Sequence, residues 1–353
     1  MKNVVYRRKT RRHSTIDALT QAQKIIFAPM VFQAVASLLD FGILQSIDIA
    51  SKTTEELIES LNLNEYTVKT LLEVAEVANI VSKNTDGKFS LTQIGKTFLY
   101  DKMTIVNFNF IRHCCYLGAS KLSNSFKSGY PAGLKYYSDS EKLYPVLPSM
   151  PREFKDAWYS FDNYYSDNCF EQVHQYIMKQ NPAKIFDIGG NTGKFEKICL
   201  KNTPAVKITM LDLPENIEVV SKKEDLCGCH FYPINVLDKN GKFPNFSGAI
   251  LMSQFLDCFS KEEIKFILSN IKNSADKGTY IYILEPFTDN QIFEGAKYSL
   301  VNTSLYFTCI ANGNSKMYTK VEMLKLLKEV GLLVCNIYEN IGINDYTLLE
   351  CKV

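Results

Sequence analysis

Residues 185–195 read IFDIGGNTGKF, an apolar stretch that ends in a glycine-rich turn and continues as a helix. The glycines at the turn, Gly189, Gly190 and Gly193, let the backbone approach a ligand closely because they carry no side chain. The stretch therefore predicts a strand, a ligand-binding turn and a helix in direct succession.

Short apolar strands alternate with helical segments from here onward. Strands are predicted at residues 184–188, 207–211, 230–234, 249–253 and 279–284. The alternation predicts a doubly wound α/β domain with a parallel sheet. A helix at 320–330 is followed by strands at 332–338 and 345–351, joined by a turn at 339–342. Such a closing hairpin predicts that the last strand lies antiparallel in the sheet.

An acid beside the turn indicates the kind of ligand. Asp187 stands two residues before the first glycine, and a carboxylate this close would repel a pyrophosphate seated on the helix N-terminus. A cationic ligand without phosphate, such as S-adenosylmethionine, tolerates the acid. Asp212 follows 25 residues later, at the end of the second strand, where a carboxylate can accept both ribose hydroxyls. Nicotinamide dinucleotide sites share this second acid, so Asp212 alone does not discriminate.

The third strand ends at Asn235 and Val236. Asn235 can hydrogen-bond the edge of an adenine ring while Val236 lies against its face. A plain turn residue is the alternative interpretation of Asn235.

Length and composition bound the protein class. The chain has 353 residues, which predicts two domains, and its 46% hydrophobic and 22% charged residues are typical of a globular protein. A net charge of +2 gives no global attraction to nucleic acid or to acidic membranes. No apolar run approaches the roughly 20 residues of a membrane helix and no secretory signal is visible, so a cytoplasmic protein without membrane contact is expected. The ten cysteines and four histidines lack metal-ligand spacing, which predicts reduced thiols and no metal site.

The N-terminal part has the pattern of a winged helix. A basic cluster at residues 7–12 is interpreted as a solvated tail, and the helix predicted at 17–44 has an apolar face that can be buried or can bind a second chain. A second helix starts at 53–56, a third begins at Asn64, and the Asp-Gly within 84–87 predicts a hairpin. The third helix carries one lysine and three glutamates, and its acidity argues against DNA binding.

Residues 101–180 are helical in pattern and rich in aromatic side chains, with glycine and proline interruptions at 129–133 and 145–151. The aromatic residues could line a pocket for a flat substrate. Ordinary core packing explains the same composition.

The chain resembles the plant-type O-methyltransferase family, the group of caffeic acid and acetylserotonin O-methyltransferases, which also has bacterial pigment members of the hydroxyneurosporene type. The resemblance rests on residues 186–193, on Leu-Asp-Leu-Pro at 211–214 and on Phe-Ser-Lys-Glu-Glu at 259–263. It implies a homodimer formed through the winged helix, S-adenosylmethionine as cofactor, S-adenosylhomocysteine as product, and a substrate enclosed between connector and sheet. We interpret the chain as a bacterial member of this family.

The resemblance predicts four segments and most of the site. The segments are a basic tail at 1–14, a winged-helix dimerisation domain at 15–100, a helical connector at 101–180 and a Rossmann-like methyltransferase domain at 181–353. The expected cofactor-binding residues are Asp187, Gly189, Gly190, Asn191, Gly193, Asp212, Leu213, Asn235, Val236, Ser253 and Gln254. The expected substrate pocket comprises His113, Tyr116, Phe161, Tyr164, Phe255 and Met317.

The sequence departs from the family at the position of the general base. The family's histidine falls on Asp257, and of the two glutamates that flank it one matches Glu285 while the other falls on Met317. We hypothesise that Asp257 accepts the proton of a phenolic acceptor and that Glu285 orients either Asp257 or the substrate. Alternatively, Asp257 caps the following helix, a role for which Ser260 competes.

Two other functions stay open at this point. One is C-methylation of an electron-rich ring in a phenolic or pigment precursor, for which a weaker base suffices and for which His113 is a spare base. The other is a non-catalytic winged-helix regulator that binds DNA.

Overall fold

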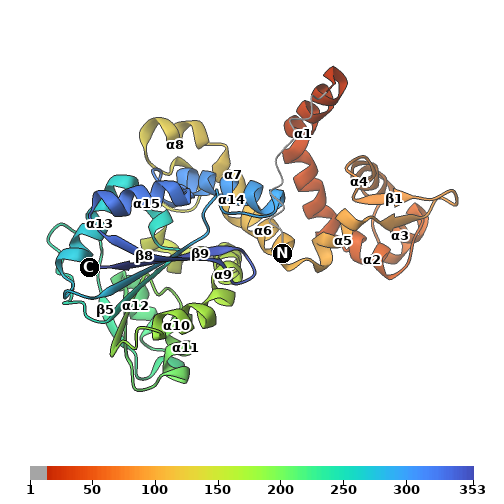
Figure 1. The fold of residues 1–353 in the computed structure, drawn as a ribbon. Coiled ribbons are helices and arrows are strands. Elements are labelled where there is room, and N and C mark those ends of the chain that lie inside the picture. Colours follow the sequence, from red (N-terminus) through yellow and green to blue (C-terminus); the bar gives the residue numbers. More distant parts are fainter. Residues whose placement is uncertain (1–13) are drawn as a thin grey trace. The chain divides into compact units, whose positions relative to one another are not determined.

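The computed structural model describes residues 14–353, in two compact units that divide between Ile105 and Val106. The basic cluster at residues 7–12 lies outside the described residues. Figure 1 traces the order of helices and strands along the chain.

The first unit is helical with one small hairpin. It contains α1 (Thr15–Asp40), α2 (Ile43–Ile49), α3 (Thr54–Leu61), α4 (Glu65–Val77), β1 (Val81–Lys83), β2 (Phe89–Leu91) and α5 (Gln93–Tyr100), and α6 (Lys102–Phe110) leads out of it. Thr53 caps α3 through a capping box with Glu56, and β1 pairs antiparallel with β2, as the sequence predicts.

Helix α1 buries only part of its predicted apolar face. Only Val35, Ala36 and Leu38 are buried, whereas Ile26 is 62% and Met30 67% exposed, so the described chain does not cover the apolar face. The helix also ends at Asp40, before the left-handed Gly42.

Helix α1 also corrects the expectation that no segment approaches the length of a membrane span. Of the helices in residues 14–353, α1 is the one whose length and apolar composition would allow it to cross a membrane. Single polar residues interrupt its apolar ones, which hides this content from a search for continuous runs.

The second unit is built on a seven-stranded sheet with the order β5-β4-β3-β6-β7-β9-β8. Its strands are β3 (Lys184–Ile188), β4 (Lys207–Asp212), β5 (His230–Pro233), β6 (Ala249–Ser253), β7 (Tyr280–Glu285), β8 (Leu333–Ile341) and β9 (Tyr346–Lys352). The strands from β3 to β7 run parallel, and β9 is antiparallel to both of its neighbours. The predicted fold class is confirmed, although β8 continues to Ile341 and moves the closing turn to residues 342–345.

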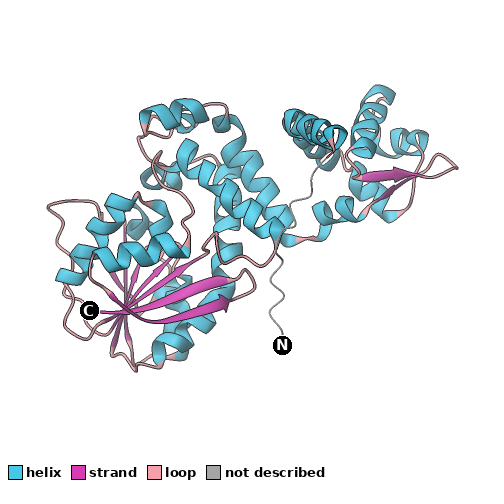
Figure 2. Ribbon diagram, turned by 45° about the horizontal axis from the view of Figure 1, so that its top comes forward, coloured by secondary structure: helices cyan, strands magenta, loops and turns pink. Residues whose placement is uncertain are grey.

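Alternate residues of each strand face opposite layers of helices. Ile185 packs against α10 (Phe170–Met178) and α11 (Lys194–Asn202), whereas its neighbour Phe186 packs toward α13 (Lys261–Asn273) and α15 (Lys320–Glu329). Helix α12 (Pro214–Val220) covers the outer part of the first layer. Helices therefore cover both faces of the sheet (Figure 2).

A third group of helices packs around its own core at one end of this unit. Its earlier elements are η1 (Ile111–Cys115), α7 (Tyr116–Ala119), α8 (Leu122–Ser128), η2 (Ala132–Tyr136), η3 (Tyr144–Ser149), α9 (Arg152–Ser166) and η4 (Asp167–Cys169). They pack with α14 (Glu294–Tyr306) and η7 (Phe307–Ala311), and Trp158 Nε1 donates a 2.7 Å hydrogen bond to Tyr306 Oη. The predicted connector thus shares a core with a segment about 150 residues further along the chain.

Candidate functional site

The glycine turn after β3 is shaped so that no side chain can fill it. Gly189 has a φ of +83°, and a Cβ built there would lie 2.4 Å from the ring of Phe255. A Cβ on Gly190 would lie 2.5 Å from Glu196 Oε1. Gly193 adopts a φ of +81° and begins α11. These contacts are far below ordinary packing distances, so the turn depends on its glycines.

Asp212 is held rigidly at the end of β4. Its Oδ2 accepts hydrogen bonds from Asn191 N at 2.9 Å and from Asn216 Nδ2 at 2.8 Å, and its Oδ1 accepts one from Leu213 N at 2.7 Å. Burial raises the pKa of the carboxyl, and the three donors oppose that rise. The carboxylate is therefore fixed beside the glycine turn, at the carboxyl edge of the sheet.

A buried pair of carboxyls lies beneath the turn. Asp187 is 3% exposed and Glu196, from the first turn of α11, is fully buried. Burial raises the pKa of Asp187 to about 7, and burial next to Asp187 raises that of Glu196 well above its usual range. Both shifts therefore favour the protonated form of these carboxyls. Sequence reasoning missed Glu196, because its neighbour Asp187 lies on a different element, β3. The glycine turn, and no regular helical spacing, brings the two carboxyls together.

Asn235 serves as a turn residue. Its Oδ1 accepts a 3.0 Å hydrogen bond from Leu237 N, while Asn235 and the buried Val236 both line the same cavity as Asp212. The two interpretations of Asn235 are therefore compatible.

Asp257 lies in η6 (Leu256–Cys258), directly after β6, and is 6% exposed. Burial raises its pKa to about 7, and the nearby carboxyl of Asp162 adds to the rise. The Cys258 thiol lies 3.4 Å from Asp257 Oδ1 and 3.1 Å from Tyr144 Oη. Asp257 does not cap α13, because Ser260 and Glu263 form the capping box there.

Glu285, at the end of β7, anchors the turn that carries Asp257. Its Oε1 accepts hydrogen bonds from Phe255 N at 3.1 Å and Leu256 N at 2.9 Å, and its Oε2 is buried without a partner. Burial, with Asp257 nearby, raises its pKa well above the usual range. Glu285 does not line the main cavity; it borders a small space behind Asp257. We therefore regard it as a positioning residue.

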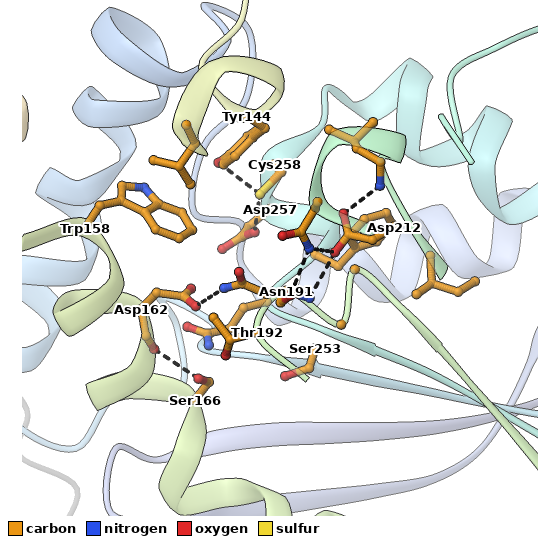
Figure 3. Close-up of a pocket in the computed structure, with 18 of the residues that line it drawn as sticks. Tyr144, Trp158, Asp162, Ser166, Asn191, Thr192, Asp212, Ser253, Asp257 and Cys258 are labelled. Carbon is orange, nitrogen blue, oxygen red and sulfur yellow. Dashed lines mark hydrogen bonds between the residues drawn. The ribbon is translucent and has the colours of Figure 1, made fainter. Parts of the chain in front are cut away.

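One cavity of about 400 Å³ collects these groups at the carboxyl edge of the sheet (Figure 3). The predicted residues that line it are Asp187, Gly189, Gly190, Asn191, Asp212, Leu213, Asn235, Val236, Ser253, Gln254, Phe255, Asp257, Phe161 and Met317. Gly193 does not line the cavity and acts by opening α11.

Three predicted pocket residues do not line the cavity: His113, Tyr116 and Tyr164. Helix α9 contributes positions 158, 159, 161, 162, 163 and 166 to the cavity wall, and Tyr164 is not among them. His113 lies in the π-helical turn η1, and Tyr116 begins the helix after it. Phe110, just before that turn, reaches the cavity instead.

Sequence reasoning missed several wall residues, among them Tyr144, Asp162 and Tyr306, whereas Trp158 is one of the connector aromatics that were expected at a pocket. Asp162 Oδ2 accepts a 2.6 Å hydrogen bond from Asn191 Nδ2, which ties α9 to the glycine turn (Figure 3). Asp162 lies four residues after Trp158 and four before Ser166, and this spacing on one helix face could have indicated that Asp162 lies beside Trp158.

Comparisons with known proteins agree with this architecture. The sequence pattern of the Dimerisation2-like domain family matches residues 20–89, and that of the O-methyltransferase domain family matches residues 154–332. Tabersonine 16-O-methyltransferase of Catharanthus roseus is 27% identical over 168 residues, which cover 47% of this chain and 44% of that protein. The chain thus matches less than half the length of this curated relative.

Two solved structures share the fold along nearly the whole chain. The mitomycin 7-O-methyltransferase MmcR has a TM-score of 0.71 at 17% identity, with 95% of this chain and 97% of the other covered. The O-methyltransferase NcsB1 from neocarzinostatin biosynthesis, in complex with S-adenosylmethionine and 2-hydroxy-5-methyl naphthoic acid, has a TM-score of 0.69 at 17% identity, with 97% and 99% covered. Because the sequence pattern of the O-methyltransferase domain family matches half of the residues of this chain, the chain belongs to that family.

Proposed function

We propose that this protein transfers a methyl group from S-adenosylmethionine to the hydroxyl of a small aromatic acceptor. The observation that carries the proposal is the convergence of the glycine turn, Asp212 and Asp257 on one cavity with aromatic walls. A ligand-binding turn and a poised base on the same cavity are what such a transfer needs, because the reaction depends chiefly on alignment.

The residues at the turn fit this cofactor. Gly189 and Gly190 line the cavity, and the Asp212 carboxylate is placed to accept hydroxyl donors. Asp187 and Asp212 both border the cavity, an arrangement that disfavours a pyrophosphate and suits a cation. When bound, S-adenosylmethionine supplies a methyl group that its sulfonium charge has already activated.

The chain's own residues prepare the acceptor. Asp257 accepts the proton of the acceptor hydroxyl on a carboxylate oxygen, which its pKa of about 7 permits near neutral pH. Glu285 holds the backbone of the turn before Asp257, and Trp158 and Tyr306, joined by their hydrogen bond, form a wall that excludes water.

Titration calorimetry with S-adenosylmethionine and then S-adenosylhomocysteine tests the cofactor site. Micromolar binding of both supports the proposal and leads to a screen of phenolic acceptors with methyl-labelled cofactor. Absence of binding by either ligand overturns it. Mass spectrometry of the methylated product separates transfer to oxygen from transfer to a ring carbon.

The quaternary state and location belong to the same proposal. A homodimer through the N-terminal unit is supported by the Dimerisation2-like match and by the uncovered apolar side chains of α1. The acidic residues Glu65, Glu73 and Glu76 of α4 disfavour a DNA-binding role. We place the enzyme in the cytoplasm.

A further inference from the structure

The charged side chains of the cavity are mostly acidic. Those that line it are Lys142, Asp162, Asp167, Asp187, Lys194, Asp212 and Asp257. No arginine or histidine of residues 14–353 is among the lining residues. The character of the cavity therefore depends on whether its two lysines are free.

Both lysines are already paired. Lys142 Nζ lies 3.3 Å from Glu263 Oε1, and Lys194 forms a close ion pair with Asp167. Each pair cancels its own charge, so neither ammonium is available to a ligand without the loss of a partner.

Four carboxyls remain that no cationic side chain accompanies. Asp187 and Asp212 lie at the glycine turn, where the positive charge of the proposed cofactor meets them. Asp162 on α9 and Asp257 in η6 are therefore the carboxyls that remain for the acceptor. Hydrogen bonds from Asn191 reach Asp162 and Asp212, but an amide brings no positive charge. Burial raises the pKa of Asp162 to about 6, although the hydrogen bond from Asn191 and the charge of Lys194 oppose the rise, and burial raises that of Asp257 to about 7.

Aromatic rings complete the surroundings. Tyr144, Trp158, Tyr159, Phe161, Tyr306 and Phe307 all line the cavity. An ammonium group is attracted to the face of an aromatic ring, most strongly to that of Trp or Tyr. Aromatic rings and carboxylates together therefore suit a cationic ligand.

We propose that the acceptor is a cationic aromatic amine, a phenol whose side chain carries a protonated nitrogen, and not a phenolic carboxylic acid. This inference rests on the proposed function and names its substrate class. A bound ammonium neutralises part of the unpaired negative charge. A bound carboxylate would be taken out of water with no free cation to receive it and with Asp162 and Asp257 facing it.

The test uses three catechols that share the same ring and carry a substituent of different charge: dopamine as the cation, 4-methylcatechol as the neutral compound, and 3,4-dihydroxyphenylacetate as the anion. Trp158 is the single tryptophan of the chain and stands in the cavity wall, so its fluorescence reports binding directly (Figure 3). Titrations are made on protein saturated with S-adenosylhomocysteine.

We expect dopamine to bind at least about tenfold more tightly than 3,4-dihydroxyphenylacetate, with 4-methylcatechol between them. Equal affinity of cation and anion, tighter binding of the anion, or no measurable binding of dopamine overturns the proposal.

A matched pair of variants places the effect in the cavity. Asp162→Asn keeps an oxygen acceptor for Asn191 and should reduce the preference for dopamine several-fold. Asp139→Asn removes the same charge from a fully exposed side chain and should leave the preference unchanged. Melting temperatures of both variants confirm that each is folded, and an unchanged preference in folded Asp162→Asn contradicts the role of that carboxylate.

The two proposals fail in different ways. Loss of the proposed function shows as no binding of S-adenosylhomocysteine, before any catechol is added. Failure of this inference shows as normal binding of S-adenosylhomocysteine together with the wrong order of the three catechols.

Discussion

Asp257 is the residue on which turnover should depend most. We expect Asp257→Asn to lower kcat by about two orders of magnitude, because the amide cannot accept a proton, while the affinity for S-adenosylhomocysteine changes little. In the unsubstituted enzyme, kcat should fall below about pH 7, where Asp257 becomes protonated, and the residual rate of the variant should lack this fall. Initial rates across pH, with a calorimetric titration, measure both effects.

Ser260→Ala is the matched control for this variant. It removes the cap of α13 only three residues away and should cost about 1 kcal/mol of stability without moving the pH profile. An Asp257→Asn enzyme with undiminished turnover would show that the base lies elsewhere.

The glycine turn offers a second test at single positions. Gly190→Ala puts a Cβ within 2.5 Å of Glu196 Oε1 and 2.8 Å of Met210 Cγ, so we expect weaker cofactor binding and a lower melting temperature. Gly295→Ala, in the exposed first turn of α14 with no atom within 4 Å of the new Cβ, should leave binding intact and stabilise the helix by up to about 1 kcal/mol. Calorimetry and thermal melting compare the two, and equal effects would contradict the steric account.

Site residues were predictable where local sequence defines them. Asp187, Gly190 and Asp212 belong to strand ends, and parallel strands bring their carboxyl ends to one edge. Asp162 could not be found in this way, because its role depends on a hydrogen bond to Asn191, 29 residues later.

The short helix η6 is the element that carries Asp257, and it is held from two sides. Glu285 accepts from Phe255 N and Leu256 N, and Asn312 Nδ2 donates to Cys258 O at 2.8 Å. Because burial raises the pKa of Glu285 well above its usual range, we expect a neutral glutamine to be a faithful replacement.

We expect Glu285→Gln to retain most of kcat and an unchanged pH profile, since its amide oxygen can accept the same two backbone donors. Glu285→Ala leaves those donors unsatisfied in the interior and should lower kcat at least about tenfold with little change in KM. Steady-state kinetics across pH distinguish the two. A glutamine variant as impaired as the alanine variant would mean that an ionised Glu285 is required.

Among the elements, the strands and capped helices were the most predictable. The alternation of strands with helices, and cap residues such as Thr53 and Ser260, define them locally. The joint core of α9 with α14 and η7 was not predictable, because the contact of Trp158 with Tyr306 joins segments that no periodicity relates.

Helix α1 carries the prediction for the whole assembly. Its exposed apolar side chains should form the contact between two copies, so the double variant Ile26→Glu with Met30→Glu should sediment as a monomer where the unsubstituted protein is a dimer. Val77→Glu alters an equally apolar side chain, 89% exposed on α4, and should remain dimeric. Sedimentation equilibrium without detergent decides, and a dimeric double variant would exclude α1 as the interface.

The buried carboxyls make the stability of the whole molecule depend on pH. Burial raises the pKa of Asp162 to about 6 and that of Asp187 and Asp257 to about 7, against about 4 in an unfolded chain. Between about pH 4 and pH 7 the folded state therefore binds more protons than the unfolded state, and the free energy of unfolding falls as the pH rises.

We expect the ligand-free protein to lose a few kcal/mol of unfolding free energy between about pH 5 and pH 8, measured by urea denaturation. The Asp257→Asn variant should lose less over the same range. A free energy of unfolding that rises across this range would contradict the assignment. Glu322 has the opposite effect on stability. Despite partial burial, hydrogen bonds including one from Lys261 lower its pKa to about 2. Its contribution to the free energy of unfolding is therefore lost only as the pH falls below about 4.5.

The position of β9 has a consequence for synthesis on the ribosome. This strand comes from residues 346–352 but lies between β7 and β8, and β7 ends at Glu285, about 60 residues earlier. While those residues are being translated, the nascent chain presents the bare edge of β7, whose apolar side chains are buried in the finished fold. Neighbouring nascent chains on one message can pair with that edge before β9 arrives. The yield of native protein should therefore depend on how quickly residues 286–352 are translated, independently of how stable the completed enzyme is.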